Sequence, residues 1–308
     1  MPASYTFEDL SGTTASSSGN PYDGLIEACN DDPKQIQAKY ETHRNTREGQ
    51  QKAKLLSPAF DAVIVDETLL KLETQPGFED PRHCLVFWAR PPKAVRSLIS
   101  EVQQRLKEVA PRLWLMPEDC LHTTTLEITH SLTEPEITDL VNRLKPVASK
   151  VVNYTLDHRA RIIKPKITYD AQAMALSFLP AAGEGRSAAD DKFTYHHLRK
   201  ELWSVCTEAG VKVESRYVVP SAHLTIGRFI FADEFKKSDG SFDHDRMQKL
   251  VEVIEQTNKW LEQTYWPDAE GRIKEGGEWI LGQEKGLDHR RGTIWYGGGE
   301  TVVLGKGF

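Results

Sequence analysis

The sequence predicts an α+β fold, or a mixed α/β fold, in which one order of elements occurs twice. Short apolar runs typical of buried strands alternate with amphipathic helical stripes. The order helix, strand, helix is centred first on His122 and again on His223. The chain of 308 residues is 39% hydrophobic, which supplies a sizeable core and excludes a fully disordered chain. We therefore expect a duplicated architecture without close sequence similarity between the two halves.

The N-terminal region differs from the rest of the chain. A stretch rich in Ser, Thr and Gly over residues 11–19 holds few large apolar groups, and residues 33–56 are polar but permit a helix. We expect residues 1–59 to form a mobile tail followed by a polar surface helix. The compact domain is expected over residues 60–308.

The first half begins with the apolar run His83–Ala89, which predicts a buried strand. Pro91 and Pro92 end this run. A helical stripe over residues 93–109 follows. Residues 122–129 are rich in Thr, Leu and Ile and predict a strand. The next helix opens at Thr133 with Pro and acids in its first turn and carries its stripe to residue 147.

The second half repeats this alternation. Helices are expected near 191–209, where Gly210 suits the C-cap, and near 244–264. Strands are expected over 153–164, 173–179, 211–218, 223–231, 278–284, 293–297 and 300–304.

Charge and cysteine content limit the class of protein. The net charge is −6, whereas a protein that coats duplex nucleic acid should be basic, so long duplexes are excluded as partners. The four cysteines are widely spaced without a CxxC pair, which favours a reducing compartment. The sequence has no apolar run of membrane-spanning length and no secretory leader. We expect a soluble monomer in the cytoplasm, with the nucleus as the alternative, and no membrane partner.

Two His-x-Thr motifs carry the chemistry. Because side chains at i and i+2 of a strand share one face, His122 is paired with Thr124 and His223 with Thr225. Imidazole exchanges protons near neutral pH, and a hydroxyl donates to a phosphoryl oxygen. Chance placement would give about 1.3 matches to the looser pattern His-x-Ser/Thr, so the motif alone is weak. The motif occupies an equivalent place in both halves. This favours a functional site over the alternative, two half-buried strand histidines that make ordinary hydrogen bonds.

The stretch Arg82–Ser131 resembles the 2H phosphoesterases, the superfamily of 2′-5′ RNA ligase-like proteins and cyclic nucleotide phosphodiesterases. The matching features are the first strand, the helix after it and the segment from Trp114 to the first motif; the segment Pro220–Phe229 is similar to the second signature. The order of elements matches over roughly residues 80–305. Thr123 stands where the family often has an apolar residue, and Ala222 where it often has Pro.

The resemblance implies a bilobal fold with pseudo-twofold symmetry, in which two antiparallel sheets line a central cleft and helices lie outside. It places His122 and Thr124 in one lobe and His223 and Thr225 in the other, facing each other. It also implies that the enzyme uses no metal and no other cofactor.

The chemistry follows from the residue types. In-line displacement at a phosphodiester needs a base on the attacking oxygen and an acid on the leaving oxygen. Two facing imidazoles supply both groups, and the threonine hydroxyls can hold the non-bridging oxygens. One histidine must start neutral and the other protonated, which predicts a bell-shaped pH profile. The sequence does not assign acid and base.

For other residues the sequence gives weaker indications of a place in the site. Tyr217 can stack on a base or donate to phosphate as a substrate-binding residue, or pack in the core. Either Phe87 or Trp88 is expected to line the site. Arg228 lies an odd number of residues from His223, so a regular strand would point it away from the cleft.

The leading hypothesis is a metal-independent phosphodiesterase that hydrolyses 2′,3′-cyclic phosphates of nucleotides or RNA ends. Trimming of an RNA 3′ end by transesterification is the enzymatic alternative. A non-catalytic module that binds nucleotides or RNA ends is a different class, and so is an interaction protein that docks through residues 33–56.

Overall fold

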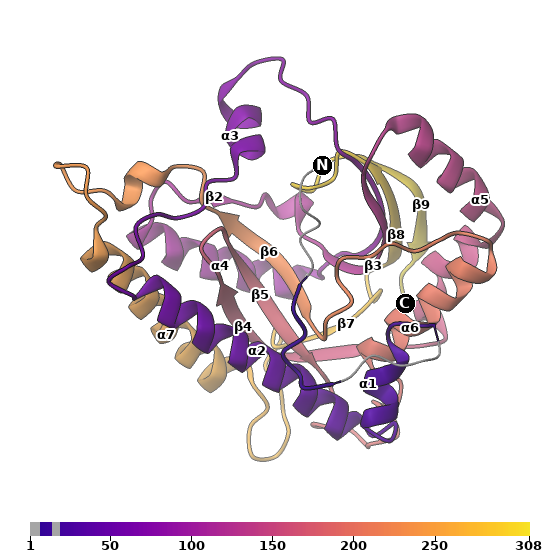
Figure 1. Cartoon of the computed structure of the whole chain (residues 1–308). Helices are drawn as coiled ribbons and strands as arrows, with labels where there is room; N and C mark the ends of the chain where they lie inside the picture. Colours follow the sequence, from indigo (N-terminus) through magenta and orange to yellow (C-terminus); the bar gives the residue numbers. More distant parts are fainter. Residues whose placement is uncertain (1–6, 14–18) are drawn as a thin grey trace.

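The computed structural model describes residues 7–13 and 19–308 (Figure 1). Its strands form two antiparallel sheets, which we name sheet A and sheet B. Sheet A has the strand order β3-β1-β8-β9 and curls strongly; sheet B has the order β2-β6-β5-β4-β7. Helices lie outside both sheets (Figure 1). The expected α+β fold with two antiparallel sheets is confirmed.

The strands of sheet A are β1 (His83–Ala89), β3 (Thr123–Leu132), β8 (Lys285–Gly292) and β9 (Glu300–Lys306). Those of sheet B are β2 (Trp114–Leu115), β4 (Arg161–Tyr169), β5 (Ala173–Pro180), β6 (Ala222–Arg228) and β7 (Glu278–Ile280). The helices are α1 (Asp23–Ala28), α2 (Pro33–Leu55), α3 (Glu67–Thr74), α4 (Lys93–Val109), α5 (Glu134–Val152), α6 (Tyr195–Glu208) and α7 (His244–Tyr265). Short 3₁₀ turns cover Glu118–Cys120, Tyr154–Leu156 and Ala232–Phe235.

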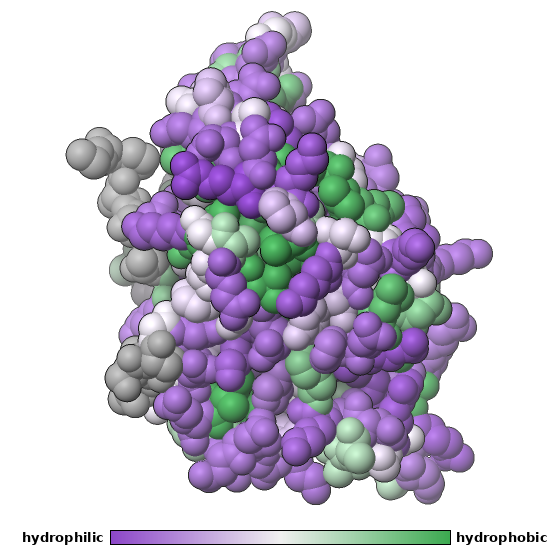
Figure 2. Space-filling view, turned by 90° about the vertical axis from the view of Figure 1, so that its right-hand side faces the viewer, coloured by the Kyte–Doolittle hydropathy of each residue, from purple (hydrophilic) through white to green (hydrophobic). Residues whose placement is uncertain are grey.

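The helices bury the faces that their apolar stripes predict. α5 packs on β1, β8 and β9, whereas α7 packs on β4 and on α4. α6 lies between α5, α1 and β3, so it reaches the edge of sheet A that carries the first motif. The face in Figure 2 is largely hydrophilic with small hydrophobic areas. Over the described part of the chain, the large apolar side chains left exposed are Leu56, Ile64, Leu72, Leu304 and Phe308.

The helix α2, which was expected to be a polar surface helix, contributes to the core. α2 begins after the cap Asp32, close to the predicted start, but its residues Ile36 and Tyr40 are buried in the main core. Tyr22 of the preceding segment is also fully buried. The core therefore includes residues well before Phe60. The mobile tail predicted at the N-terminus falls in part on residues 1–6 and 14–18, which lie outside the described residues.

Several expected strands are corrected. Residues 211–218 form a loop, because the backbone N–H of Arg216 donates to the Glu127 carboxylate instead of a strand ladder. Residues 153–164 begin with the C-cap of α5, Asn153, and a 3₁₀ turn, and β4 starts only at Arg161. Residues 293–297 form a connection, while the charged strand β8 before them has no apolar alternation to predict it. No helix in the described residues is long and apolar enough to cross a membrane.

Candidate active site

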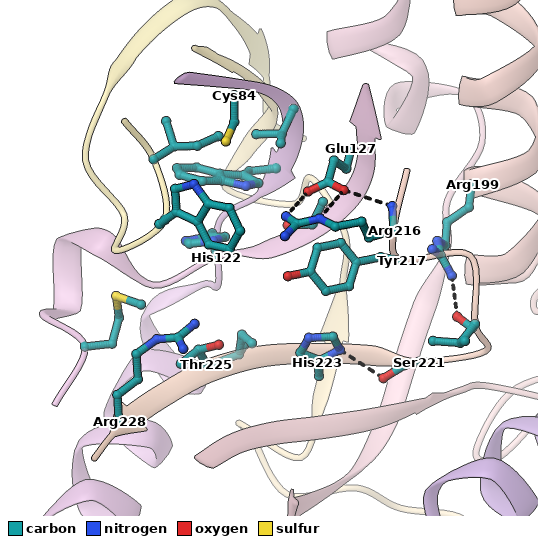
Figure 3. A pocket seen from close by; sticks show the side chains of 18 residues that line it. Cys84, His122, Glu127, Arg199, Arg216, Tyr217, Ser221, His223, Thr225 and Arg228 are labelled. Atoms are coloured by element: carbon teal, nitrogen blue, oxygen red, sulfur yellow. Dashed lines mark hydrogen bonds and ion pairs between the residues drawn. The ribbon is translucent and has the colours of Figure 1, made fainter. Parts of the chain in front are cut away.

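One pocket brings the predicted site residues together. His122, Thr124, Tyr217, His223 and Thr225 all line it (Figure 3). The other lining residues are Cys84, Val86, Trp88, Met116, Glu127, Arg199, Arg216, Val219, Ser221, Leu224, Arg228, Ile294 and Trp295. The two His-x-Thr motifs thus face one cavity from the two sheets, while the catalytic roles of these residues stay predictions.

Two hydrogen bonds hold the motifs in place. The hydroxyl of Thr123 donates to the backbone carbonyl of His223, with an O···O distance of 2.8 Å. The Tyr195 hydroxyl, from α6, donates to the carbonyl of Thr124 at 3.0 Å. Thr123 is one of the two positions at which the sequence differs from the pattern of the 2H phosphoesterases, and its hydroxyl joins the first motif directly to the second.

His122 is clamped in one orientation. Its ring stacks on Trp88, with ring centroids 3.7 Å apart and 18° between the planes. Its Nδ1 lies 2.7 Å from the carbonyl oxygen of Cys120. A carbonyl can only accept, so Nδ1 carries the proton and Nε2 keeps its lone pair in the neutral ring. Of the two candidates on β1, Trp88 is therefore the one that lines the site.

The surroundings of His122 favour its neutral form. Burial lowers its pKa to about 3, and the positive charges of Arg90 and Arg290 act in the same direction, against the opposing Cys120 hydrogen bond. Both guanidinium groups lie over Trp88, on which the imidazole stacks. In the free protein His122 is thus neutral at neutral pH, with its lone pair on Nε2.

His223 is held differently. Its Nδ1 lies 2.9 Å from the hydroxyl oxygen of Ser221, which can either donate or accept. Burial lowers its pKa to about 4, and Arg199 contributes the next largest effect in that direction. Burial therefore favours the neutral form of His223, as it does that of His122.

Tyr217 lies in the loop before β6, not on a strand as expected. Its ring stacks on Phe7, with centroids 5.0 Å apart, and its centroid is 5.9 Å from that of His223. In Figure 3 its hydroxyl points into the middle of the pocket. Burial raises the pKa of this phenol, so the hydroxyl keeps its proton at neutral pH and can donate.

A β-bulge follows each motif and brings in a further charged residue. On β3, Thr124 pairs with Trp88 while Leu126 pairs with Phe87, so one extra residue is inserted. On β6, Thr225 pairs with Ala175 and Gly227 with Met174, which is the same shift.

The extra residue reverses the alternation of side chains after each bulge. Glu127 and Arg228, each three positions after the motif threonine, therefore face the pocket. The expectation that Arg228 points away from the cleft is wrong for this reason, because it assumed a regular strand.

The two residues delivered by the bulges are paired with opposite charges. Glu127 is 3% exposed and accepts from the Arg216 side chain through both carboxylate oxygens, at 3.0 and 2.6 Å. Arg216 in turn lies over Trp295, 4.3 Å from its ring centroid. Arg228 forms an ion pair with Asp66 at 3.3 Å. The sequence showed only one hint of this layout, the acid Glu127 inside an apolar strand.

The pocket is positively charged within an acidic protein. Its lining holds three arginines and a single acid, Glu127, and that acid is neutralised by Arg216. Such a lining favours an anionic ligand. Among the described residues, no group of three or more His, Cys, Asp or Glu is arranged to hold a metal ion.

Comparison with known proteins adds distant similarities. No protein-family model and no curated protein sequence matches this chain. In structure, the chain is similar to Usb1. The solved structure of Kluyveromyces marxianus Usb1 with uridine monophosphate is 11% identical, covers 73% of this chain and 98% of its own, and gives a TM-score of 0.38. A second structure of Kluyveromyces marxianus Usb1 is 12% identical. It covers 74% of this chain and 98% of its own, and gives a TM-score of 0.33. The residue roles proposed below rest on the contacts of this chain.

Proposed function

We propose that this protein is a metal-independent phosphodiesterase that acts on nucleotides or RNA ends through His122 and His223. The observation that supports this most is the convergence of both His-x-Thr motifs on one positively charged pocket. An anionic ligand suits the arginines, and two proton-transfer groups suit an in-line displacement. The monomeric state belongs to the same proposal.

The preferred reaction is hydrolysis of a 2′,3′-cyclic phosphate. His122 takes a proton from water at Nε2, and the water oxygen forms a new bond to phosphorus. The bond from phosphorus to one ribose oxygen breaks, and protonated His223 gives its proton to that oxygen. The product is a phosphomonoester with a free hydroxyl, and proton exchange with solvent restores both imidazoles.

The remaining predicted residues hold the phosphate. The hydroxyls of Thr124 and Thr225 donate to the non-bridging oxygens, where negative charge develops during the displacement. Tyr217 donates a third hydrogen bond or stacks on the terminal base. In the transesterification alternative, the base takes the proton of the 2′-hydroxyl of the penultimate ribose, and that oxygen forms a new bond to phosphorus. The bond from phosphorus to the 5′-oxygen of the terminal nucleoside breaks, and the acid gives its proton to that oxygen. The shortened RNA then ends in a 2′,3′-cyclic phosphate, and the same two histidines serve as base and acid.

The test is product analysis on a substrate panel. The purified protein, with EDTA present, is incubated with 2′,3′-cyclic nucleotides and with short RNAs ending in a cyclic phosphate or a free 3′-hydroxyl. Conversion of cyclic phosphate to one monoester isomer supports hydrolysis. Shortening of the RNA supports trimming, with release of a nucleoside from a 3′-hydroxyl end or of a nucleoside cyclic phosphate from a cyclic phosphate end. Binding without turnover of any substrate would replace the enzyme by a binding module. Activity that disappears with EDTA and returns with a divalent ion would contradict the metal-independent mechanism.

A further inference from the structure

Arg199 is the unusual charge of the pocket. It lies on α6, is 2% exposed and nevertheless lines the cavity. Its guanidinium lies 4.6 Å from the ring centroid of Tyr22 and 5.7 Å from that of Tyr195. One nitrogen, Nη1, donates to the carbonyl of Val219 at 2.8 Å. In the described part of the chain, its Nε has no hydrogen-bond partner.

The other two arginines of the pocket have carboxylate partners, and Arg199 has none among the described residues. Arg216 is paired with Glu127 and Arg228 with Asp66. Arg199 has instead aromatic rings, a hydrogen bond with the side chain of Tyr40, and one backbone carbonyl around it. A buried charge without a counter-ion is unfavourable, and an anion from outside the protein would remove this penalty.

Arg199 is placed one short loop from the second histidine. The carbonyl of Val219 accepts from Arg199 and also from the backbone N–H of Ser221, the latter at 2.8 Å. The hydroxyl of Ser221 in turn contacts Nδ1 of His223 at 2.9 Å. Figure 3 shows Arg199 at one end of the cleft and Arg228 at the other, with the row from His223 to Thr225 between them. A phosphate at the two histidines would therefore leave Arg199 free for a second anionic group.

We propose that Arg199 binds a second phosphate of the substrate, the one that joins the terminal nucleotide to the rest of an RNA strand. This inference rests on the proposed function and narrows its substrate class to polynucleotide ends. A mononucleoside 2′,3′-cyclic phosphate carries a single phosphate and leaves Arg199 without its anion. A nucleotide at the end of an RNA strand supplies both phosphates, so one lies at the histidines and the other pairs with the Arg199 guanidinium.

The test compares two product-like ligands by isothermal titration calorimetry, uridine 3′-monophosphate and uridine 3′,5′-bisphosphate. Their difference is the 5′-phosphate, which stands for the internal phosphodiester. The wild-type protein is expected to bind the bisphosphate about tenfold more tightly or better, the gain typical of charge-assisted hydrogen bonds. In Arg199→Met the ratio of the two affinities should fall to about one, while Arg199→Lys should keep part of it.

Arg228→Met is the matched control, because it removes a paired arginine from the other end of the same pocket. It should keep the preference for the bisphosphate, which separates a specific contact from the general attraction of a positive pocket. Circular dichroism checks the fold of each variant, and the wild-type comparison stands even if Arg199→Met does not fold. Equal affinities of the wild type for both ligands, or a preference that survives in folded Arg199→Met, would overturn the inference. Neither result touches the proposed function, whose own test is turnover of the substrate panel.

Discussion

The two halves of the pocket share a backbone plan and differ in charge. In the first half, His122 immediately precedes β3, which presents Thr124 and, after its bulge, Glu127. In the second, β6 presents His223 and Thr225 and, after an equivalent bulge, an arginine. The duplicated backbone thus delivers the carboxylate of Glu127 in the first half and the guanidinium of Arg228 in the second. The comparison teaches that the architecture fixes where three side chains point, whereas the residue types set different electrostatics in each half.

The two histidines also differ in their supports. His122 stacks on Trp88 and has its tautomer set by a carbonyl, whereas His223 faces the adaptable hydroxyl of Ser221. The pKa of His122 is lowered to about 3 and that of His223 to about 4. We infer from the supports that His122, whose Nε2 holds the lone pair, is the base and that His223 is the acid.

The largest expected effect is loss of either imidazole. His122→Ala and His223→Ala should each lower kcat by about 10²–10⁴-fold, because each removes one proton-transfer group. The two losses should not multiply in the double variant, since acid and base serve one displacement. The measurement is steady-state kinetics on the substrate found in the panel. His130→Ala is the control, because His130 lies on β3 outside the pocket lining. Turnover close to wild type in a folded variant of either pocket histidine would defeat the two-histidine mechanism.

The threonines should show a smaller effect of similar size in both halves. Thr124→Ala and Thr225→Ala each remove a hydroxyl that donates to the phosphate, and kcat is expected to fall about 10–10³-fold. Thr→Ser at the same positions keeps the hydroxyl and should recover most of the rate. An alanine variant that raises KM alone would show instead that the hydroxyl binds ground state and transition state equally.

The pH profile tests the electrostatic difference between the halves. The mechanism needs one neutral and one protonated imidazole, and burial lowers both pKa values below that of free histidine. The optimum of kcat/KM, which reports the free enzyme, should therefore lie on the acid side of pH 6.5 and fall as the pH rises. The optimum of kcat should lie at higher pH, because a bound phosphate anion raises both pKa values. Coincident profiles with an optimum above pH 8 would contradict this picture.

The smallest effect concerns the hydrogen bond that joins the halves. Thr123→Val removes the hydroxyl that donates to the His223 carbonyl and leaves that acceptor unpaired. We expect a loss of about 1 kcal/mol in the free energy of unfolding. A decrease in kcat of about fivefold should accompany it, since a bond of this strength positions His223. Thr123→Ser should restore both quantities, measured by urea denaturation and by kinetics. A valine variant that matches the wild type in both would show that the two motifs are positioned independently.

Local patterns were sufficient to predict much of this molecule. β1 and α4 have the predicted bounds because their apolar periodicity is strong, and both motifs lie on strands that face one pocket. A bulge leaves no periodic signal, so the orientation of Arg228 was predicted wrongly. Arg199 lies within an apolar helical stripe, and only the tertiary contacts show that its charge has no counter-ion.

The remaining differences have the same origin. α2 carries few apolar residues, yet two of them, Ile36 and Tyr40, reach the core, which the mean polarity of the segment conceals. The segment before β6 has a strand-like composition, but the Glu127 carboxylate captures the backbone of Arg216 and holds the segment as a loop. Both outcomes depend on partners distant in sequence.

The most direct test of the central claim is a crystal structure of the protein with uridine 3′-monophosphate. We predict that the phosphate lies between the two halves of the pocket, with Nε2 of His122 and Nε2 of His223 on opposite sides of phosphorus. Each Nε2 should then be about 3 Å from a phosphate oxygen, and the hydroxyls of Thr124 and Thr225 should contact the remaining oxygens. A nucleotide bound elsewhere, or a phosphate that contacts one histidine while the other faces away, would contradict the account.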